Sequence, residues 1–371
     1  RGYTSAAATE TAAQHTSEAE VQRYYNAISQ TLLTAIKAYW DYRAAAENLK
    51  TYQISQQRVL EWTEEANKGF KMTGKAPQFA PQIARLQAFL SDKERQVISA
   101  TDWVNQTKYT LGITIGITPD QVANIGEPID GQISDFPMTA NFAPEHAMQK
   151  WVASALEKRF DLQAAKLTEQ AGSVMLAKAR RDILPQLDLK LDTGRTSFKY
   201  GNNFDNYTES LSEPGDSRGT DLSVSLNFKY PLGNNYAQSS LSSATVTHQQ
   251  NLIQLNEARR TARLEVTQSV STLMSNLRTV AKTQEVVTKG YEPALEEYKK
   301  SQPSLVTEPN ALFNLMDIEK DLVNATITRN QAVLDLAKTI AILRHQTGVL
   351  IEVEPTTNIA SLKNITKLPD L

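Results

Sequence analysis

The amino-acid sequence predicts a mainly α-helical protein with two tandem repeats of a long antiparallel coiled-coil hairpin and a strand pair with the alternation of a transmembrane β-barrel. Only 15 Gly and 14 Pro interrupt 371 residues. Apolar side chains recur every three or four residues over long stretches, which is typical of amphipathic helices. A length prior of roughly 150 residues per domain would give two or three domains. The long uninterrupted helical patterns instead indicate an extended architecture.

The composition excludes several classes of function. Lys and Arg total 39 against 41 Asp and Glu, a formal net charge of -2, so no positive excess favours nucleic acid as a partner. The absence of cysteine excludes disulfides, thiolate metal sites and a cysteine nucleophile. No window of 18 apolar residues occurs, which excludes a membrane-spanning helix and leaves a β-barrel open. Arg1 and the residues after it lack a signal peptide, so we expect any such signal to be upstream or removed.

Residues 1–116 predict the first-repeat helical hairpin. The segment 5–70 contains no proline and only one glycine, and predicts one long helix. Residues 71–81 contain one glycine and two prolines and predict a tip loop that cannot stay helical. Residues 82–110 predict the helix that runs back. The apolar spacing in the first helix is carried by Ile28, Leu32, Ile36 and Tyr39.

Two further segments lead toward the strands. Residues 117–150 are rich in glycine and proline and predict an inter-repeat linker, or equatorial segment, of short elements. Residues 151–185 predict a helix leading to the strands, which starts near Pro144 and stops at Pro185. We expect this helix to be continuous as far as Arg181.

Residues 186–231 predict a β-hairpin with an exposed loop over 195–220. Each strand is close to the roughly 9 to 11 residues that a tilted strand needs to cross a bilayer. Apolar and polar residues alternate, so one face would meet lipid or a protein partner, and periodicity alone does not decide between them. The apolar positions are Leu187, Leu189 and Leu191 in the first strand and Leu222, Val224, Leu226, Phe228 and Tyr230 in the second.

Residues 232–349 predict the second-repeat helical hairpin, and residues 350–371 a C-terminal tail or equatorial segment. A coiled-coil seam is formed by Val266, Val270, Leu273, Leu277 and Val280. A glycine and a proline at 290 and 293 predict a kink, a second tip loop follows over 301–309, and a returning helix runs over 310–346. The order matches the first repeat at an offset of about 230 residues. We therefore expect a matching strand pair upstream of Arg1.

Two short motifs add to this order of elements. Residues 176–187 pass from a helix into a strand at Leu184-Pro185, and residues 314–319 read Asn-Leu-Met-Asp-Ile-Glu just after the second tip. Together with the repeat, these motifs resemble the TolC-like outer-membrane efflux protein family. The resemblance implies a homotrimer that shares one β-barrel in outer-membrane lipid and forms an α-barrel in the periplasm of a Gram-negative bacterium. It also implies a passive export duct of a tripartite efflux or type I secretion system, coupled to an inner-membrane pump through a periplasmic adaptor, or membrane fusion, protein.

The resemblance also implies roles for individual residues. A pore constriction falls on Asn314 and Asp317, of which only Asp317 keeps the acid of the family, and on Tyr298, for which no arginine partner lies before Asn314. Three Asp317 carboxylates around a threefold axis would favour cations. Adaptor contacts fall on the two tips, at Gly74, Lys75, Pro77, Pro303, Thr307 and Pro309. The lipid-facing row is Leu222, Val224, Leu226, Phe228 and Tyr230.

Catalysis and cofactors find no support in the sequence. The four histidines are far apart, and no zinc-protease motif, nucleophile elbow or phosphate-binding glycine loop occurs. The Asn and Asp cluster at 202–206 lacks the ligand spacing of a calcium loop and is interpreted as an exposed loop, so no metal is expected. The alternative to a channel is a soluble coiled-coil scaffold protein that would bury the apolar strand row against a partner.

Overall fold

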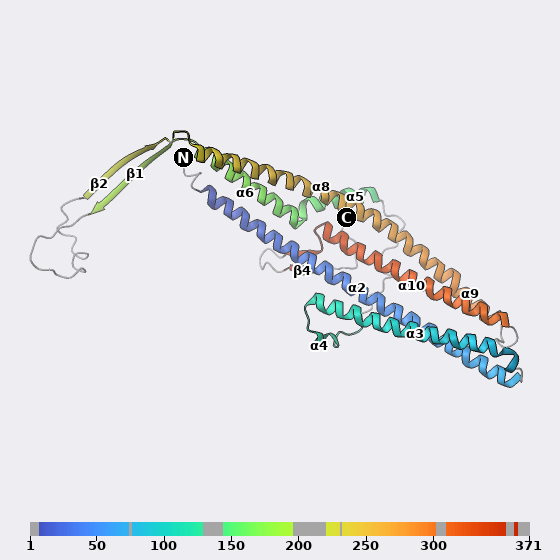
Figure 1. The fold of residues 1–371 in the computed structure, drawn as a ribbon. Helices are drawn as coiled ribbons and strands as arrows, with labels where there is room; N and C mark the ends of the chain where they lie inside the picture. Colours follow the sequence, from blue (N-terminus) through green and yellow to red (C-terminus); the bar gives the residue numbers. More distant parts are fainter. Residues whose placement is uncertain are drawn as a thin grey trace, which may run out of the picture. The chain divides into compact units, whose positions relative to one another are not determined.

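The computed structural model describes residues 7–73, 76–128, 144–195, 220–230, 232–301, 309–353 and 360–362 (Figure 1). Gly74, Lys75, Pro303 and Thr307, and the central part of the predicted exposed loop, lie outside these residues. The chain divides into two compact units. Unit 1 comprises Arg1–Val21 and Ala164–Glu257, and unit 2 comprises Gln22–Gln163 and Ala258–Leu371. The mainly helical fold class is confirmed. No helix among the described residues is both long enough and apolar enough to span a bilayer.

The first hairpin consists of α2, Ala8–Thr73, and α3, Ala76–Ile115. The loop predicted over 71–81 is wrong, because α2 continues to Thr73 and α3 starts three residues later. Pro77 lies in the first turn of α3, where a missing amide removes no intrahelical hydrogen bond. Pro81 lies inside α3 and removes only one such bond from a helix of 40 residues.

The linker contains the short helix α4, Pro119–Val122, and is followed by α5, Pro144–Lys158, and α6, Phe160–Asp182. The single helix predicted from Pro144 to Arg181 is therefore wrong by one interruption, at Arg159. The Arg159 amide still donates to the Ala155 carbonyl at 3.2 Å, and the Gln163 amide donates to the Arg159 carbonyl at 3.1 Å. The interruption is thus a local departure from helical geometry that keeps its hydrogen bonds.

A glycine from the other end of unit 2 packs against this interruption. Gly348 has φ +72°, and a Cβ built on it would lie 2.7 Å from the carbonyl carbon of Lys158 and 2.9 Å from the amide nitrogen of Arg159. Ser154 Oγ donates to the neighbouring Thr347 carbonyl at 3.2 Å. Only glycine combines this left-handed conformation with so close an approach of two backbones. Helical periodicity gives no sign of such a tertiary contact.

The second hairpin consists of α8, Asn235–Glu285, the π-helix η3, Val286–Tyr291, α9, Glu292–Ser301, and α10, Pro309–Gln346. Where the sequence predicted a kink, near residue 290, the helix changes from α-helical to π-helical hydrogen bonding in η3. Within the tail, β3, Ile351–Val353, pairs antiparallel with β4, Ala360–Leu362, a strand pair that the sequence did not predict. The predicted seam on α8 is confirmed: Val266, Val270, Leu273 and Val280 are buried, and Leu277 packs against them.

Two apolar clusters form the main core of unit 2. The Leu273 cluster joins α2, α5, α8 and α10, and the Leu315 cluster joins α2, α3, η3, α9 and α10. The Leu273 cluster includes Ile36, Trp40, Trp151, Val266, Val270, Leu273, Val280, Leu336, Ile340 and Leu343. The Leu315 cluster includes Val59, Trp62, Leu86, Val287, Leu295, Leu312, Leu315, Met316 and Leu322. Helices of both hairpins therefore share each cluster.

Unit 1 holds the strand pair and the helix ends beside it. The strands β1, Gln186–Arg195, and β2, Thr220–Lys229, are antiparallel. Asn234 Nδ2 donates to the Ile183 carbonyl at 3.1 Å, which joins the end of β2 to the start of β1. The helices α6 and α8 approach closely at Gly172, where a Cβ would lie 2.6 Å from Asn251 Nδ2. The strand pair thus starts from a closely packed pair of helices.

Candidate functional site

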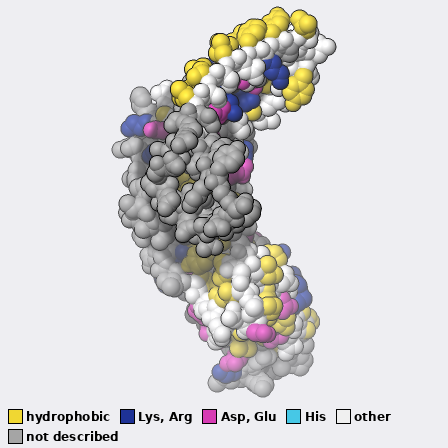
Figure 2. All heavy atoms as spheres, turned by 90° about the vertical axis from the view of Figure 1, so that its left-hand side faces the viewer, with side chains coloured by type: hydrophobic (Ala, Val, Ile, Leu, Met, Phe, Trp, Pro, Cys, Tyr) yellow, Lys and Arg dark blue, Asp and Glu magenta, His cyan; other side chains and the backbone are white. Residues whose placement is uncertain are grey.

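One face of the strand pair is apolar over most of its length and ends in polar residues, with Thr193 opposite Leu222 and Arg195 opposite Thr220. Register pairs Leu187 with Phe228, Leu189 with Leu226 and Leu191 with Val224, so apolar side chains lie opposite one another across the two strands. We call Leu187, Leu189, Leu191, Leu222, Val224, Leu226, Phe228 and Tyr230 the apolar strand face; each of these side chains is between 56% and 71% exposed. In Figure 2 hydrophobic side chains gather along one side of the strand pair, at the top of the view.

The opposite face of the strand pair is polar. Here Asp188 lies opposite Asn227, Lys190 opposite Ser225 and Asp192 opposite Ser223. Lys190 Nζ lies 3.2 Å from Asp192 Oδ2, an exposed ion pair along one strand. A two-stranded hairpin is marginally stable in water, and no described residue covers the apolar strand face. The strand pair therefore has the pattern of a sheet that meets an apolar medium on one side and water on the other.

The three residues predicted for the constriction lie on α9 and α10 of the second hairpin. Asn314 and Asp317 are exposed and lie three residues apart on α10, hence on one face of that helix. The Tyr298 hydroxyl on α9 donates to the Ala311 carbonyl at 3.1 Å, and its ring packs against the Leu315 cluster. Pro77 and Pro309 lie in the first turns of α3 and α10. Tyr298 therefore links α9 to the first turn of α10 within the hairpin.

A buried charge cluster lies beside this tip, and sequence reasoning missed it. Glu319 is 0% exposed, and its Oε2 lies 3.1 Å from Nη1 of Arg58 on α2. Lys93 on α3 is 2% exposed, with its Nζ 4.9 Å from the centre of the Phe89 ring. Burial raises the pKa of Glu319 although Arg58, Ser55, Lys93 and Lys299 act against it, and burial lowers the pKa of Lys93. The available signal was spacing, because Glu319 follows Leu315 by four residues on the buried stripe of α10.

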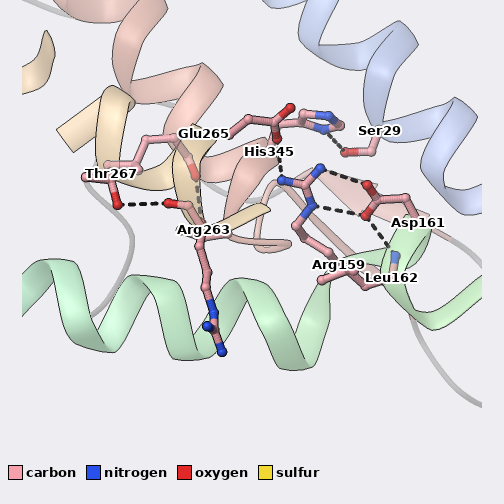
Figure 3. A network of polar contacts seen from close by, with 10 residues as sticks. Ser29, Arg159, Asp161, Leu162, Arg263, Glu265, Thr267 and His345 are labelled. Atoms are coloured by element: carbon pink, nitrogen blue, oxygen red, sulfur yellow. Dashed lines mark hydrogen bonds and ion pairs between the residues drawn. The ribbon is translucent and has the colours of Figure 1, made fainter. Parts of the chain in front are cut away.

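A second polar network holds the chain at the α5–α6 interruption (Figure 3). Arg159 binds Asp161 through Nε at 3.0 Å and Nη2 at 2.7 Å, and its Nη1 lies 2.5 Å from Oε2 of Glu265 on α8. The Leu162 amide donates to Asp161 at 2.9 Å, and Ser29 Oγ lies 2.8 Å from His345 Nδ1. Sequence reasoning missed this network because its members come from four separate segments.

The pKa values in this network follow from burial and from Arg159. Burial alone would raise the pKa of Asp161, but the hydrogen bonds and charge of Arg159 and the Leu162 amide outweigh it, so the pKa lies below its usual value. Burial lowers the pKa of His345, and the Arg159 cation lowers it further. No three His, Asp or Glu side chains of the described ranges come together in a way that could hold a metal ion. These contacts connect the α5–α6 interruption to α8, and α2 to α10.

A sequence comparison decides the family. The sequence model of the family described as "outer membrane efflux protein" matches residues 151–341, which is more than half of the chain. The chain belongs to the outer membrane efflux protein family. The matched segment contains the strand pair, Tyr298, Asn314, Asp317 and Glu319, and ends before the β3–β4 pair. Proteins of the family are passive channels and not enzymes. No curated protein matches the chain.

Solved structures of bacterial membrane proteins share the fold of this family member. The outer membrane protein VceC from Vibrio cholerae is 19% identical with a TM-score of 0.67, and the match covers 93% of this chain and 75% of VceC. A membrane protein from Pseudomonas aeruginosa is 15% identical with a TM-score of 0.67, covering 92% and 71%. The Campylobacter jejuni CmeC outer membrane channel is 15% identical with a TM-score of 0.62, covering 92% and 67%. At such identities the comparison shows the fold and assigns no residue a role.

Proposed function

We propose that this chain is a channel component of the outer membrane and acts as the passive exit duct of a tripartite efflux or type I secretion system. The observation that carries the proposal is the apolar strand face, eight exposed apolar side chains on one side of a two-stranded sheet, six of which pair with one another across the strands. Family membership supplies the context, since the family consists of outer membrane efflux proteins. An apolar outer row with a polar inner row is the pattern of a strand that separates lipid from a wet lumen.

The strand pair is proposed to form part of a shared transmembrane β-barrel. Bacterial barrels have at least about eight strands, so β1 and β2 need further strands to close one. A homotrimer, with its barrel in the outer membrane and its helices in the periplasm, agrees with the resemblance. Its three copies supply six strands from β1 and β2, so the proposed barrel also takes strands from outside this pair. In this arrangement Leu222, Val224, Leu226, Phe228 and Tyr230 face lipid, while Asp188, Lys190 and Asp192 face the lumen.

The second hairpin is proposed to narrow the helical end of the duct. Asp317 and Asn314 are exposed on one face of α10 and are free to line a pore. A ring of Asp317 carboxylates would raise the local cation concentration. Tyr298 would hold the ends of α9 and α10 together at this level. The two tips, including Gly74, Lys75, Pro77, Pro303, Thr307 and Pro309, are proposed to contact a periplasmic adaptor that connects the duct to an inner-membrane pump.

The test is made on protein extracted from outer membranes in mild detergent. We expect its native mass to correspond to three chains and planar bilayers to show discrete ion conductance. Asp317→Asn is expected to reduce the ratio of cation to anion permeability, whereas Asp335→Asn, at another exposed position of α10, is expected to leave it unchanged. A water-soluble monomer or dimer without conductance would overturn the channel and favour the coiled-coil scaffold. Equal effects of the two substitutions would overturn the assignment of Asp317 alone.

A further inference from the structure

The helix of the second hairpin changes its hydrogen bonding at one place. Between α8 and α9, the six residues of η3 form a π-helix, and the amide of Glu292 donates to the carbonyl of Val287, five residues earlier. A π-helix of one turn corresponds to one extra residue inserted into an α-helix and is frequent at functional positions. Gly290 lies inside this turn, and Pro293, which has no amide to donate, follows it. A Cβ on Gly290 would meet nothing within 4 Å, so close packing does not require glycine there.

The apolar core of unit 2 is interrupted at the position of η3 along the hairpin. On α8 the Leu273 cluster ends at Val280, and the Leu315 cluster begins at Val287 in η3. On α10, residues 326–331 separate the two clusters and contain no buried side chain. On α2, no residue between 45 and 58 belongs to either cluster. Three neighbouring helices therefore lose their apolar packing over matching stretches.

A polar layer fills part of this gap. Asn330 Nδ2 on α10 donates to Asn48 Oδ1 on α2 at 2.9 Å, and Arg329 Nη2 donates to Asn330 Oδ1 at 2.9 Å. A hydrogen bond between two half-buried amides adds little net stability, because water can replace it when the helices separate. Local openings concentrate where buried apolar contacts are few. The layer is thus softer than the clusters on either side.

The part of unit 2 beyond this layer is held together as one body. The Leu315 cluster joins α2, α3, η3, α9 and α10. The half-buried Arg58 on α2 pairs with the fully buried Glu319 on α10, and Lys93 on α3, 2% exposed, lies within electrostatic influence of Glu319. Parting these charges would leave a buried carboxylate without its counter-charge, which is strongly unfavourable. Movement is therefore concentrated in the polar layer.

We propose that η3 and the Asn48–Asn330 hydrogen bond form a joint between two bodies of unit 2. The Leu315 body, the parts of α2, α3, η3, α9 and α10 that carry the Leu315 cluster, tilts relative to the Leu273 body, the parts of α2, α5, α8 and α10 that carry the Leu273 cluster. The extra residue of η3 lets the helix bend without breaking, and Val287 anchors the turn in the Leu315 cluster. The Leu315 body carries Tyr298, Asn314 and Asp317, so tilting moves the proposed constriction as one piece. That last step rests on the proposed function, whereas the joint itself does not.

Spin-label distances test the joint directly, since the chain has no cysteine and paired labels can be introduced cleanly. Thr272→Cys with Glu296→Cys spans the joint over roughly 36 Å, at 1.5 Å of rise per residue. Arg259→Cys with Lys282→Cys lies within regular α8 and is the control pair, with a similar separation along the helix. Labelled chains are diluted with unlabelled chains so that only distances within one chain are measured. We expect a broad distance distribution for the first pair and a narrow one for the second; equal widths would overturn the joint.

Deleting Thr288, an exposed residue of η3, removes the extra residue. This deletion is expected to narrow the distance distribution of the joint-spanning pair to the width seen for the control pair. Gly290→Ala provides a second variant that keeps the chain length and favours regular helix. Ser271→Ala, at an exposed position of α8, is its control and should change neither distribution. If Gly290→Ala narrows the distance distribution of the joint-spanning pair and Ser271→Ala does not, the joint is supported. If neither substitution narrows the distribution, or both narrow it equally, the joint is contradicted.

Hydrogen exchange of the unsubstituted protein adds a measurement that needs no variant. Backbone amides of residues 286–292 are expected to exchange about tenfold faster than those of residues 271–280 in regular α8. Equal protection of the two segments would overturn the joint. Because neither measurement uses conductance, the joint can fail while the channel stands, and the channel can fail while the joint stands.

Discussion

The strand pair of unit 1 and the helical seam of unit 2 are both patterned with leucine and valine, and the two patterns have opposite outcomes in the fold. Leu273 on the seam is 0% exposed, whereas Leu226 on the apolar strand face is 67% exposed. The helices satisfy their pattern within the chain, because α2, α5 and α10 cover the seam. None of the described residues covers the strand pattern. The comparison therefore separates residues that stabilise the helical core from residues that we propose to face lipid.

The largest expected effect tests the helical side of this comparison. Leu273→Ala removes a fully buried side chain from a cluster of four helices and should lower the free energy of unfolding by about 2 to 5 kcal/mol. Leu226→Ala truncates an exposed side chain and should change the free energy of unfolding in detergent by less than about 1 kcal/mol. Thermal or denaturant unfolding followed by circular dichroism measures both. Equal losses would show that the strand row is covered within the chain after all.

The next effect tests the strand side. Leu226→Arg places a charge on the apolar strand face and should impair insertion, at a cost of roughly 2 to 4 kcal/mol near the middle of a bilayer. The fraction of assembled protein in isolated outer membranes measures this. Ser223→Arg is the matched control, because it puts the same side chain on the polar face opposite Asp192. Normal assembly of Leu226→Arg, or equal impairment by Ser223→Arg, would contradict the lipid-facing assignment.

A smaller effect contrasts an ion-pair network around a mostly buried arginine with an isolated exposed ion pair. Arg159→Met leaves Asp161 and Glu265 without their shared cation and should destabilise the protein by about 1 to 3 kcal/mol. Arg95→Met breaks an exposed pair with Asp92, at 2.6 Å, and should cost no more than about 0.5 kcal/mol. Melting temperatures of the two variants give the comparison. If both variants melt alike, the α5–α6 junction is held by packing and not by its ion pairs.

Periodicity predicted the long helices and the alternating strands, because both depend on which residues face one side of an element. Val266, Val270 and Leu273 were assigned to a seam from spacing alone and are buried there. The trimer, the tandem repeat and the transmembrane barrel stay predictions, since they concern other copies of the chain or segments beyond the described residues. The roles of Asp317, Asn314 and Tyr298 stay predictions for the same reason.

Features that depend on contacts between distant segments were missed or misplaced. The interruption at Arg159 depends on the approach of Gly348, which is 189 residues away in the chain. The charges of Arg58, Lys93 and Glu319 come from three helices, and of the three only Glu319 carries a sign of burial in the sequence, its spacing of four from Leu315. The tip loop of the first hairpin was predicted too long, because two prolines were read as helix breakers although one of them lies in a first turn.

The smallest expected effect concerns pH and acts on the helical side alone. His345 lies beside Ser29 and is influenced by Arg159 and Lys37, which lower its pKa, and by Asp161 and Glu265, which raise it. Burial is the largest influence, so its pKa in the folded protein lies below the usual 6.5. The unfolded chain then binds more protons than the folded chain just below pH 6.5, so this contribution to stability is present above that pH and is lost as the pH falls.

His345→Gln keeps a hydrogen-bonding group near Ser29 and does not titrate. The wild-type protein should lose stability as the pH falls from about 6.5 through the folded pKa, and the variant should lose less over the same interval. Unfolding at several pH values between neutrality and pH 5 measures the difference. Loss of the Asp161 contribution occurs at lower pH, because its pKa is depressed below 3.8, and does not overlap this interval. Parallel curves for the two proteins would show that His345 keeps its ordinary pKa and that water reaches the α5–α6 junction.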